Sequence, residues 1–452
     1  MAQTISEDRR RIFEDYPVPK AVLTMSIPTI CSSLVMIFYN LADTYFVGLL
    51  NNPIQNAAVT LAAPLLLAFN AVTNLFGVGC SSLMSRSIGK KDYEKVKHTS
   101  AFGFYGAFGC ALLYSLIYFL FKSGILGLLG AGKDTLSATS AYLFWTVGLG
   151  AVPSIINVVM SNLVRSEGYS LQASIGTMSG CILNVILDPF FILPWGLNMG
   201  ASGAGLATMI GNSVACIYFL IILYIRRHTT LLSLKPTDFS LDKEIVGDVC
   251  SVGIPASIQN LLNVAGMTIL NNFSAGYGAD AVAAMGICHK VSQLPLYVSM
   301  GMAQGIMPLI SFNYSAKNGR RMKDVILFTV KIAGGFMIIV ALLLSIFSGP
   351  VTGFFIQTES IINYGHYFLR GMSLAMPFLA LDFLGVAVFQ SCGMGKLSFF
   401  FAVARKILLE IPALFILNYF FPLYGLAYAQ LCAEVVLAVA AVIVLKRIFD
   451  KV

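Results

Sequence analysis

The sequence predicts an all-α integral membrane protein built from two similar halves. Apolar residues make up 57% of the chain and charged residues 11%, whereas soluble proteins carry about 25% charged residues. Most side chains must therefore face lipid or other buried helices. The triplets Ser26–Pro28 and Gly253–Pro255 each open a long apolar segment and lie 227 residues apart. Duplicated halves in a chain with many spans are typical of secondary transporters, which favours transport as the function.

Each half contains six apolar segments of membrane-spanning length. We expect spans at 21–50, 57–86, 98–121, 136–163, 169–193, 203–225, 246–274, 281–312, 325–347, 362–391, 398–420 and 424–445. A polar stretch between the sixth and seventh segments marks the boundary between the halves. The predicted domains are an N-terminal lobe at 1–225, a cytoplasmic linker at 226–245 and a C-terminal lobe at 246–452.

Lysine and arginine are concentrated in alternate loops, mainly 90–97, 226–243 and 317–323, whereas the opposite loops carry little beyond Lys122 and Lys133. Cytoplasmic loops of membrane proteins carry this excess of positive charge. We therefore expect a multi-pass protein of the cytoplasmic membrane with both termini in the cytoplasm. The net charge of +8 follows from the same loops, so we expect no nucleic-acid partner.

No residue pattern predicts an enzyme or a bound cofactor. The nine cysteines stand singly and the four histidines are dispersed, without the spacing of a metal site. The segment 127–133, GLLGAGK, resembles the start of a phosphate-binding loop, but Asp134 stands where Ser or Thr would bind magnesium. We interpret it as a glycine-rich external turn. An ion gradient, rather than ATP, is then the expected energy source.

Acidic residues within predicted spans point to a coupling site, because a carboxylate there costs about 3 kcal/mol on insertion scales. Asp43, Asp188 and Thr208 all lie roughly 8–10 Å below the outer surface, counted from the predicted span ends. Asn184 precedes Asp188 by one turn and shares its helix face. Two neighbouring carboxylates resist joint ionisation, so one is expected to bind a proton. The same oxygens could instead hold Na⁺, and the alternative is that both acids brace helix ends.

Two further features bear on transport. Pro28 lies inside the first span and leaves one backbone carbonyl without its usual donor, which predicts either a static kink or a hinge. Aromatic, methionine and polar residues could line a cavity for flat amphipathic cations through stacking and cation–π contacts, or could simply pack against lipid and other helices. These candidates are Tyr39, Asn40, Phe69, Trp145, Tyr297, Met300, Asp382 and Phe383.

Several motifs resemble those of the multidrug and toxic compound extrusion (MATE) family, closer to its prokaryotic DinF-like and MepA-like branch than to NorM. The resemblance extends from about Pro17 to Arg447. Its carriers are 40–48 (NLADTYFVG), 85–92 (SRSIGKKD), 166–169 (SEGY), 184–189 (NVILDP) and 301–317. Each motif alone is weak evidence for the resemblance, but their order along both halves of the chain is specific to this family.

The resemblance implies twelve helices in two six-helix lobes that form a V around a central cavity. It implies export of drugs or toxins coupled to entry of H⁺ or Na⁺. We expect H⁺ rather than Na⁺ as the coupling ion, alternating access as the mechanism and a monomer as the working unit. The family's N-lobe ion site matches Asp43, Asn184, Asp188 and Thr208, and its bending proline matches Pro28. The NorM-type acid of the seventh span is absent at 259–263, so the N-lobe site is favoured over a cation site in the C-terminal lobe.

Three acids within predicted spans have no assigned role, namely Asp382, which lies near an acid of the NorM branch, Glu410 and Glu434. The alternative function is flipping of lipids or lipid-linked precursors, which would favour additional spans and several cavity arginines. Arg370 is the only arginine that we expect in the middle of a span, which favours the exporter.

Overall fold

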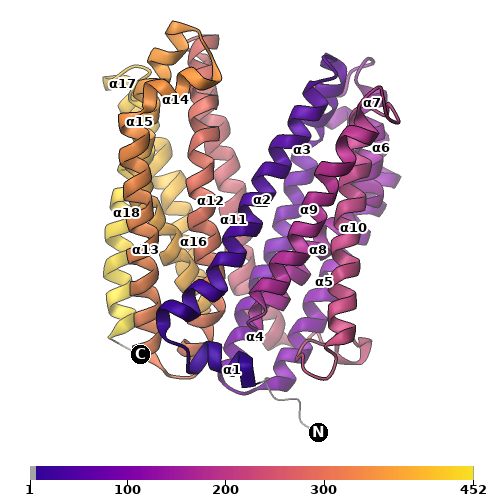
Figure 1. Ribbon diagram of the computed structural model, residues 1–452, viewed down its shortest axis with the longest axis vertical. Helices are drawn as coiled ribbons and strands as arrows, with labels where there is room; N and C mark the ends of the chain where they lie inside the picture. Colours follow the sequence, from indigo (N-terminus) through magenta and orange to yellow (C-terminus); the bar gives the residue numbers. More distant parts are fainter. Residues whose placement is uncertain (1–6, 451–452) are drawn as a thin grey trace. The chain divides into compact units, whose positions relative to one another are not determined.

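The computed structural model describes residues 7–450, which form helices and turns and contain no strand. The two chain ends, whose cytoplasmic location was predicted, lie outside this range. The helices shown in Figure 1 and the short segments between them are α1 (Glu7–Glu14), α2 (Val18–Gly48), α3 (Pro53–Thr73), η1 (Asn74–Val78), α4 (Gly79–Gly89), α5 (Tyr93–Leu120), α6 (Lys122–Leu128), α7 (Leu136–Leu143), η2 (Phe144–Leu149), α8 (Ala151–Ser166), α9 (Ser170–Ile192), α10 (Ala201–Ile225), η3 (Pro236–Asp238), α11 (Lys243–Ala275), α12 (Ala279–Ser315), α13 (Gly319–Ile346), α14 (Ser348–Phe355), α15 (Glu359–Ser391), α16 (Gly395–Val403), η4 (Ala404–Glu410), α17 (Ile411–Phe420) and α18 (Leu426–Phe449). The predicted all-α fold is confirmed.

The number of helices apolar enough to cross a membrane is smaller than the twelve predicted spans. Within residues 7–450, ten helices meet this condition, and an eleventh span forms if 136–149 and 151–166, bent by 48° at their junction, count as one. The predicted span 398–420 is helical in α16, η4 and α17. It is not among the apolar helices because Arg405, Lys406 and Glu410 lie within it.

The structure divides into two compact units. The first comprises 1–15 and 31–257, and the second comprises 16–30 and 258–452. These limits differ from the predicted lobes, because α2 and α11 each contribute to both units. Both divisions fall two residues after a helix-internal proline, Pro28 in α2 and Pro255 in α11.

The polar stretch that was predicted as an inter-lobe linker is fixed to the first unit. The buried carboxylate of Glu167 accepts hydrogen bonds from the Thr230 hydroxyl at 2.8 Å and from the backbone N–H groups of Leu231 and Leu232 at 2.5 and 2.9 Å. Hydrogen bonds to a charged group are about twice as strong as neutral ones. The segment 230–232, which follows α10 and is called the strap below, is therefore held against this unit by hydrogen bonds.

The duplication inferred from the sequence is also visible in hydrogen bonds. Ser85 donates to the carbonyl oxygen of Ser166 at 3.0 Å in the first unit. In the second unit, Ser311 donates to the carbonyl oxygen of Ser391 at 2.9 Å. Each serine fastens the end of one helix to the end of another, and the two pairs lie at corresponding positions of the repeats.

Candidate ion-binding site in the first unit

The site is built on the close approach of α9 and α10, which lie side by side (Figure 1). A Cβ atom added to Gly211 would lie 2.5 Å from the carbonyl oxygen of Gly180, and one added to Gly180 would lie 2.7 Å from the carbonyl oxygen of Gly211. Small residues let helices approach in this way within membranes. The two glycines therefore bring the polar residues of α9 against those of α10.

Thr208 joins the three helices that carry the predicted ion-binding residues. Its hydroxyl accepts a hydrogen bond from the amide nitrogen of Asn184 on α9 at 3.2 Å. The hydroxyl of Tyr39, on α2, lies 3.4 Å from the same oxygen. The structure therefore brings Asn184 and Thr208 together as the sequence predicts, and it adds Tyr39 as a direct contact.

The carboxylates of this site have oxygens without hydrogen-bond donors. Asp188 is 0% exposed and Asn184 is 2% exposed. Both carboxyl oxygens of Asp188, the side-chain oxygen of Asn184 and Oδ1 of Asp43 are buried and have no donor among the residues that the structure describes. The Asp43 carboxylate is also near enough to Asp188 for the two groups to interact electrostatically. Unpaired buried acceptors are costly, so a proton or a cation would stabilise this arrangement.

Sequence patterns missed several polar residues around the site. Tyr142 on α7 is buried and interacts electrostatically with both Asp43 and Asp188. On α10, Asn212 bonds the side chains of Asn157 and Ser154 on α8 at 3.0 and 3.1 Å. Asparagines and serines inside predicted spans were the available signal, because polar side chains in lipid are expected to pair with one another.

The residues predicted to line a cavity are distributed over both units. Tyr39, Asn40, Phe69 and Trp145 belong to the first unit, and Tyr297, Met300, Asp382 and Phe383 belong to the second. Phe69 is buried, with its ring 5.2 Å from that of Tyr114. Asn40 is exposed and donates to the carbonyl oxygen of Met36 in its own helix at 2.8 Å. These residues remain a prediction for substrate binding.

Arg370 is not the only arginine in the middle of a predicted span, because Arg405, in η4, lies within 398–420 and is buried. Arg165 is also buried near the end of α8, two residues beyond the predicted span 136–163. Arg405 forms ion pairs with Glu434 at 2.7 Å and Asp382 at 3.5 Å. The prediction was wrong because it judged 398–420 by mean apolarity, whereas buried acids on other helices offset its positive charge.

Pro28 lies inside a helix that continues on both sides of it. The α-helical segment α2 extends without interruption from Val18 to Gly48. The division between the two units follows Ile30. The predicted hinge thus lies next to the point where α2 passes from one unit to the other.

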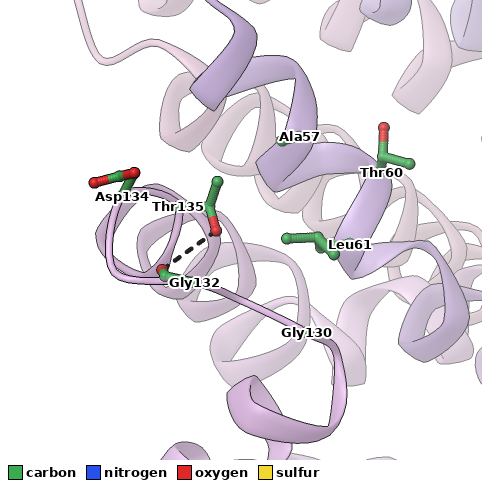
Figure 2. A pocket seen from close by; sticks show the side chains of 7 residues that line it. All are labelled: Ala57, Thr60, Leu61, Gly130, Gly132, Asp134 and Thr135. Atoms are coloured by element: carbon green, nitrogen blue, oxygen red, sulfur yellow. Dashed lines mark hydrogen bonds between the residues drawn. The ribbon is translucent and has the colours of Figure 1, made fainter.

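The glycine-rich segment 127–133 forms a helix-capping turn, in which Gly130 has φ +77°. The N–H of Ala131 donates to the carbonyl of Leu126 at 3.0 Å, and the N–H of Gly130 donates to that of Gly127 at 3.0 Å. These two bonds define a Schellman motif at the end of α6. Figure 2 shows a shallow pocket between this turn and α3, lined by Ala57, Thr60, Leu61, Gly130, Gly132, Asp134 and Thr135. The turn thus ends a helix, which explains Gly130 without a nucleotide.

Comparisons with known proteins agree with this fold along nearly the whole chain. The family model described as MatE matches residues 28–190 and again 255–416. The multidrug export protein MepA of Staphylococcus aureus (strain MRSA252) is 30% identical over 447 residues, which cover 99% of this chain and 98% of that protein. A crystal structure of MATE in the straight conformation has a TM-score of 0.92 at 24% identity and covers 99% of both chains. A MATE structure in the bent conformation has a TM-score of 0.90 at 24% identity, over 99% of this chain and 98% of that one.

Proposed function

The chain belongs to the MatE family, and we propose that it is a secondary active multidrug exporter. In this proposal, entry of H⁺ drives the outward transport of amphipathic, cationic organic compounds by alternating access. The relative at 30% identity is named a multidrug export protein, which supports the export of drugs as the general function. The protein would work as a monomer in the cytoplasmic membrane, with both termini in the cytoplasm.

The observation that carries the proposal is the set of buried oxygens on Asp43, Asn184 and Asp188 that find no hydrogen-bond donor within residues 7–450. Two buried carboxylates that repel each other cannot both stay charged without a penalty. One proton would remove one of the two charges and give the protonated carboxyl group a hydrogen-bond donor. Na⁺ could use the same oxygens, but we favour H⁺ because a proton needs only one of them.

For coupling, the ion and the substrate must both shift the equilibrium between two conformations of the same structural element. We infer that this element is α2, because its residue Tyr39 contacts Thr208 and its residue Asp43 interacts with Asp188. Protonation of one acid would relieve the repulsion between Asp43 on α2 and Asp188 on α9, and would so change how α2 packs against the α9–α10 pair. Pro28, 15 residues or roughly 22 Å before Asp43 along the helix, would allow α2 to bend at low cost.

The test is efflux of a fluorescent amphipathic cation from vesicles, with pH and sodium gradients imposed separately. We expect a pH gradient to drive efflux in wild type, and we expect Asp43→Asn or Asp188→Asn to abolish it without loss of folded protein. Asn keeps the size of the side chain but cannot gain and lose a proton. The matched control is Asp134→Asn, which changes an exposed acid in the external turn. Full efflux in both variants, or ATP-driven efflux with all gradients collapsed, would refute the proposal.

The buried arginines Arg165 and Arg405 do not favour lipid flipping as the function. A lipid headgroup would need cationic side chains open to a cavity, but Arg165 and Arg405 are 7% and 4% exposed. Arg405 is moreover held by two carboxylates. A change in the lipid accessibility of the vesicles during the same assay, without cation efflux, would support the flippase instead.

A further inference from the structure

A second cluster of ionisable residues lies within the second unit, outside the site described above. Arg405 and Lys406 are consecutive residues of the π-helical segment η4, and π-helical turns are frequent at functional sites. The Arg405 side chain lies 2.7 Å from Glu434 on α18 and 3.5 Å from Asp382 on α15. Lys406 contacts both carboxylate oxygens of Glu410, at 2.6 and 2.7 Å.

The whole cluster is enclosed. All five side chains belong to residues less than a tenth exposed. The guanidinium of Arg405 also lies 4.8 Å from the ring centre of Phe383. Gly266 on α11 leaves the room that Lys406 fills, because a Cβ atom added there would lie 3.2 Å from Nζ. Buried charges are poorly screened by solvent, so the net charge of the cluster affects its energy.

The charges of the cluster do not balance. Three carboxylates, of Asp382, Glu410 and Glu434, face two cations, Arg405 and Lys406, which leaves an excess of one negative charge if every group is ionised. His289 on α12 also interacts with Lys406 and Glu410, and its Nε2 has no hydrogen-bond partner in the described part of the chain. The neighbouring ammonium of Lys406 opposes a second positive charge on this imidazole. A carboxyl group is therefore the better place for a neutralising proton.

Two atoms point to where that proton binds. Oδ1 of Asp382 and Oε2 of Glu434 are buried and lack hydrogen-bond partners among the described residues. A hard metal ion such as Mg²⁺ or Ca²⁺ takes six or more oxygen ligands, which two free oxygens do not provide. A proton requires one oxygen and gives the carboxyl group a donor. We propose that the Asp382–Arg405–Glu434 cluster, with Lys406–Glu410 beside it, is a second proton-binding site that holds one proton on its carboxylates.

The proton can be detected by infrared spectroscopy of the purified protein at neutral pH, where exposed carboxylates are ionised. The carbonyl stretch of a protonated carboxyl group is the signal. The Asp43→Asn/Asp188→Asn double variant serves as the background, so the result does not depend on the first site or on transport. We expect the signal in this background and its loss when Glu434→Gln or Asp382→Asn is added, because either change balances the cluster's charges.

The matched control is the pair Arg405→Gln with Glu434→Gln in the same background. This pair removes one positive and one negative charge, so the excess negative charge and the proton signal should both remain. Absence of the signal from the background, its survival in both single acid variants, or its loss in the matched pair would each overturn the proposal. If one variant does not yield monodisperse protein, Glu410→Gln tests the same charge balance from another residue.

Discussion

The substitution Gly211→Ala tests whether the contact between α9 and α10 sets the geometry of the proposed ion site. The added Cβ atom would lie 2.5 Å from the Gly180 carbonyl oxygen, whereas ordinary contacts begin at 3.4 Å. The helices must therefore separate locally by about 0.9 Å. A displacement of this size would lengthen the bond between Asn184 and Thr208 from 3.2 Å to about 4 Å, beyond the range of a hydrogen bond.

A lost hydrogen bond between buried groups costs about 1 kcal/mol, which corresponds to roughly a fivefold change in an equilibrium constant. We therefore expect about fivefold weaker apparent proton affinity, measured as the dependence of efflux on the imposed pH gradient. The strain of overpacking, about 1–3 kcal/mol, should also lower the Tm.

The matched control for this substitution is Gly109→Ala on α5, where an added Cβ atom meets nothing within 4 Å. It introduces the same methyl group into a helix without forcing two helices apart. Equal proton affinity in Gly211→Ala, Gly109→Ala and wild type would refute the argument that this contact positions Asn184 against Thr208.

Two further substitutions test other parts of the proposal. Pro28→Ala should retain substrate binding but slow turnover, because the restored N–H donor stiffens α2. The control is Pro64→Ala, at an exposed proline inside α3. Equal turnover in the two variants would show that Pro28 does not act as a hinge. Glu167→Gln should lower stability by about 2 kcal/mol, since the amide cannot replace all the charge-assisted bonds to the strap. The exposed Glu94→Gln should leave the Tm unchanged, and a similar Tm for both glutamine variants would contradict the strap's contribution.

Helix geometry made much of the first site predictable. A one-turn spacing places Asn184 and Asp188 on one face, and counting residues from the span ends placed Thr208 at the same depth. These two facts place Asn184 and Thr208 at the same depth, and the close approach of α9 and α10 at Gly180 and Gly211 brings them into contact. Tyr142 was not predicted, because its position beside the acids depends on how α7 packs against other helices, and depth alone does not specify this.

The cluster around Arg405 could not be found by the same method. Hydropathy is calculated for one segment of the sequence at a time. It therefore does not detect that the charge of Arg405 is offset by Glu434 on α18 and Asp382 on α15, which lie on other segments. The limits of the two units were also hidden, because they fall inside the continuous helices α2 and α11. Composition marks polar loops between helices and gives no signal for a division within one.

The duplicated scaffold holds two different electrostatic arrangements. In the first unit, Asp43 and Asp188 present oxygens that lack donors among the described residues, so any neutralising charge must come from solution. In the second unit, Arg405 and Lys406 are cations attached to the chain and occupy most of the carboxylate oxygens around them. An attached cation cannot be exchanged across the membrane, whereas a proton can. The first unit is therefore better suited to drive transport, and the second can bind a proton only to the extent that its acids outnumber its bases.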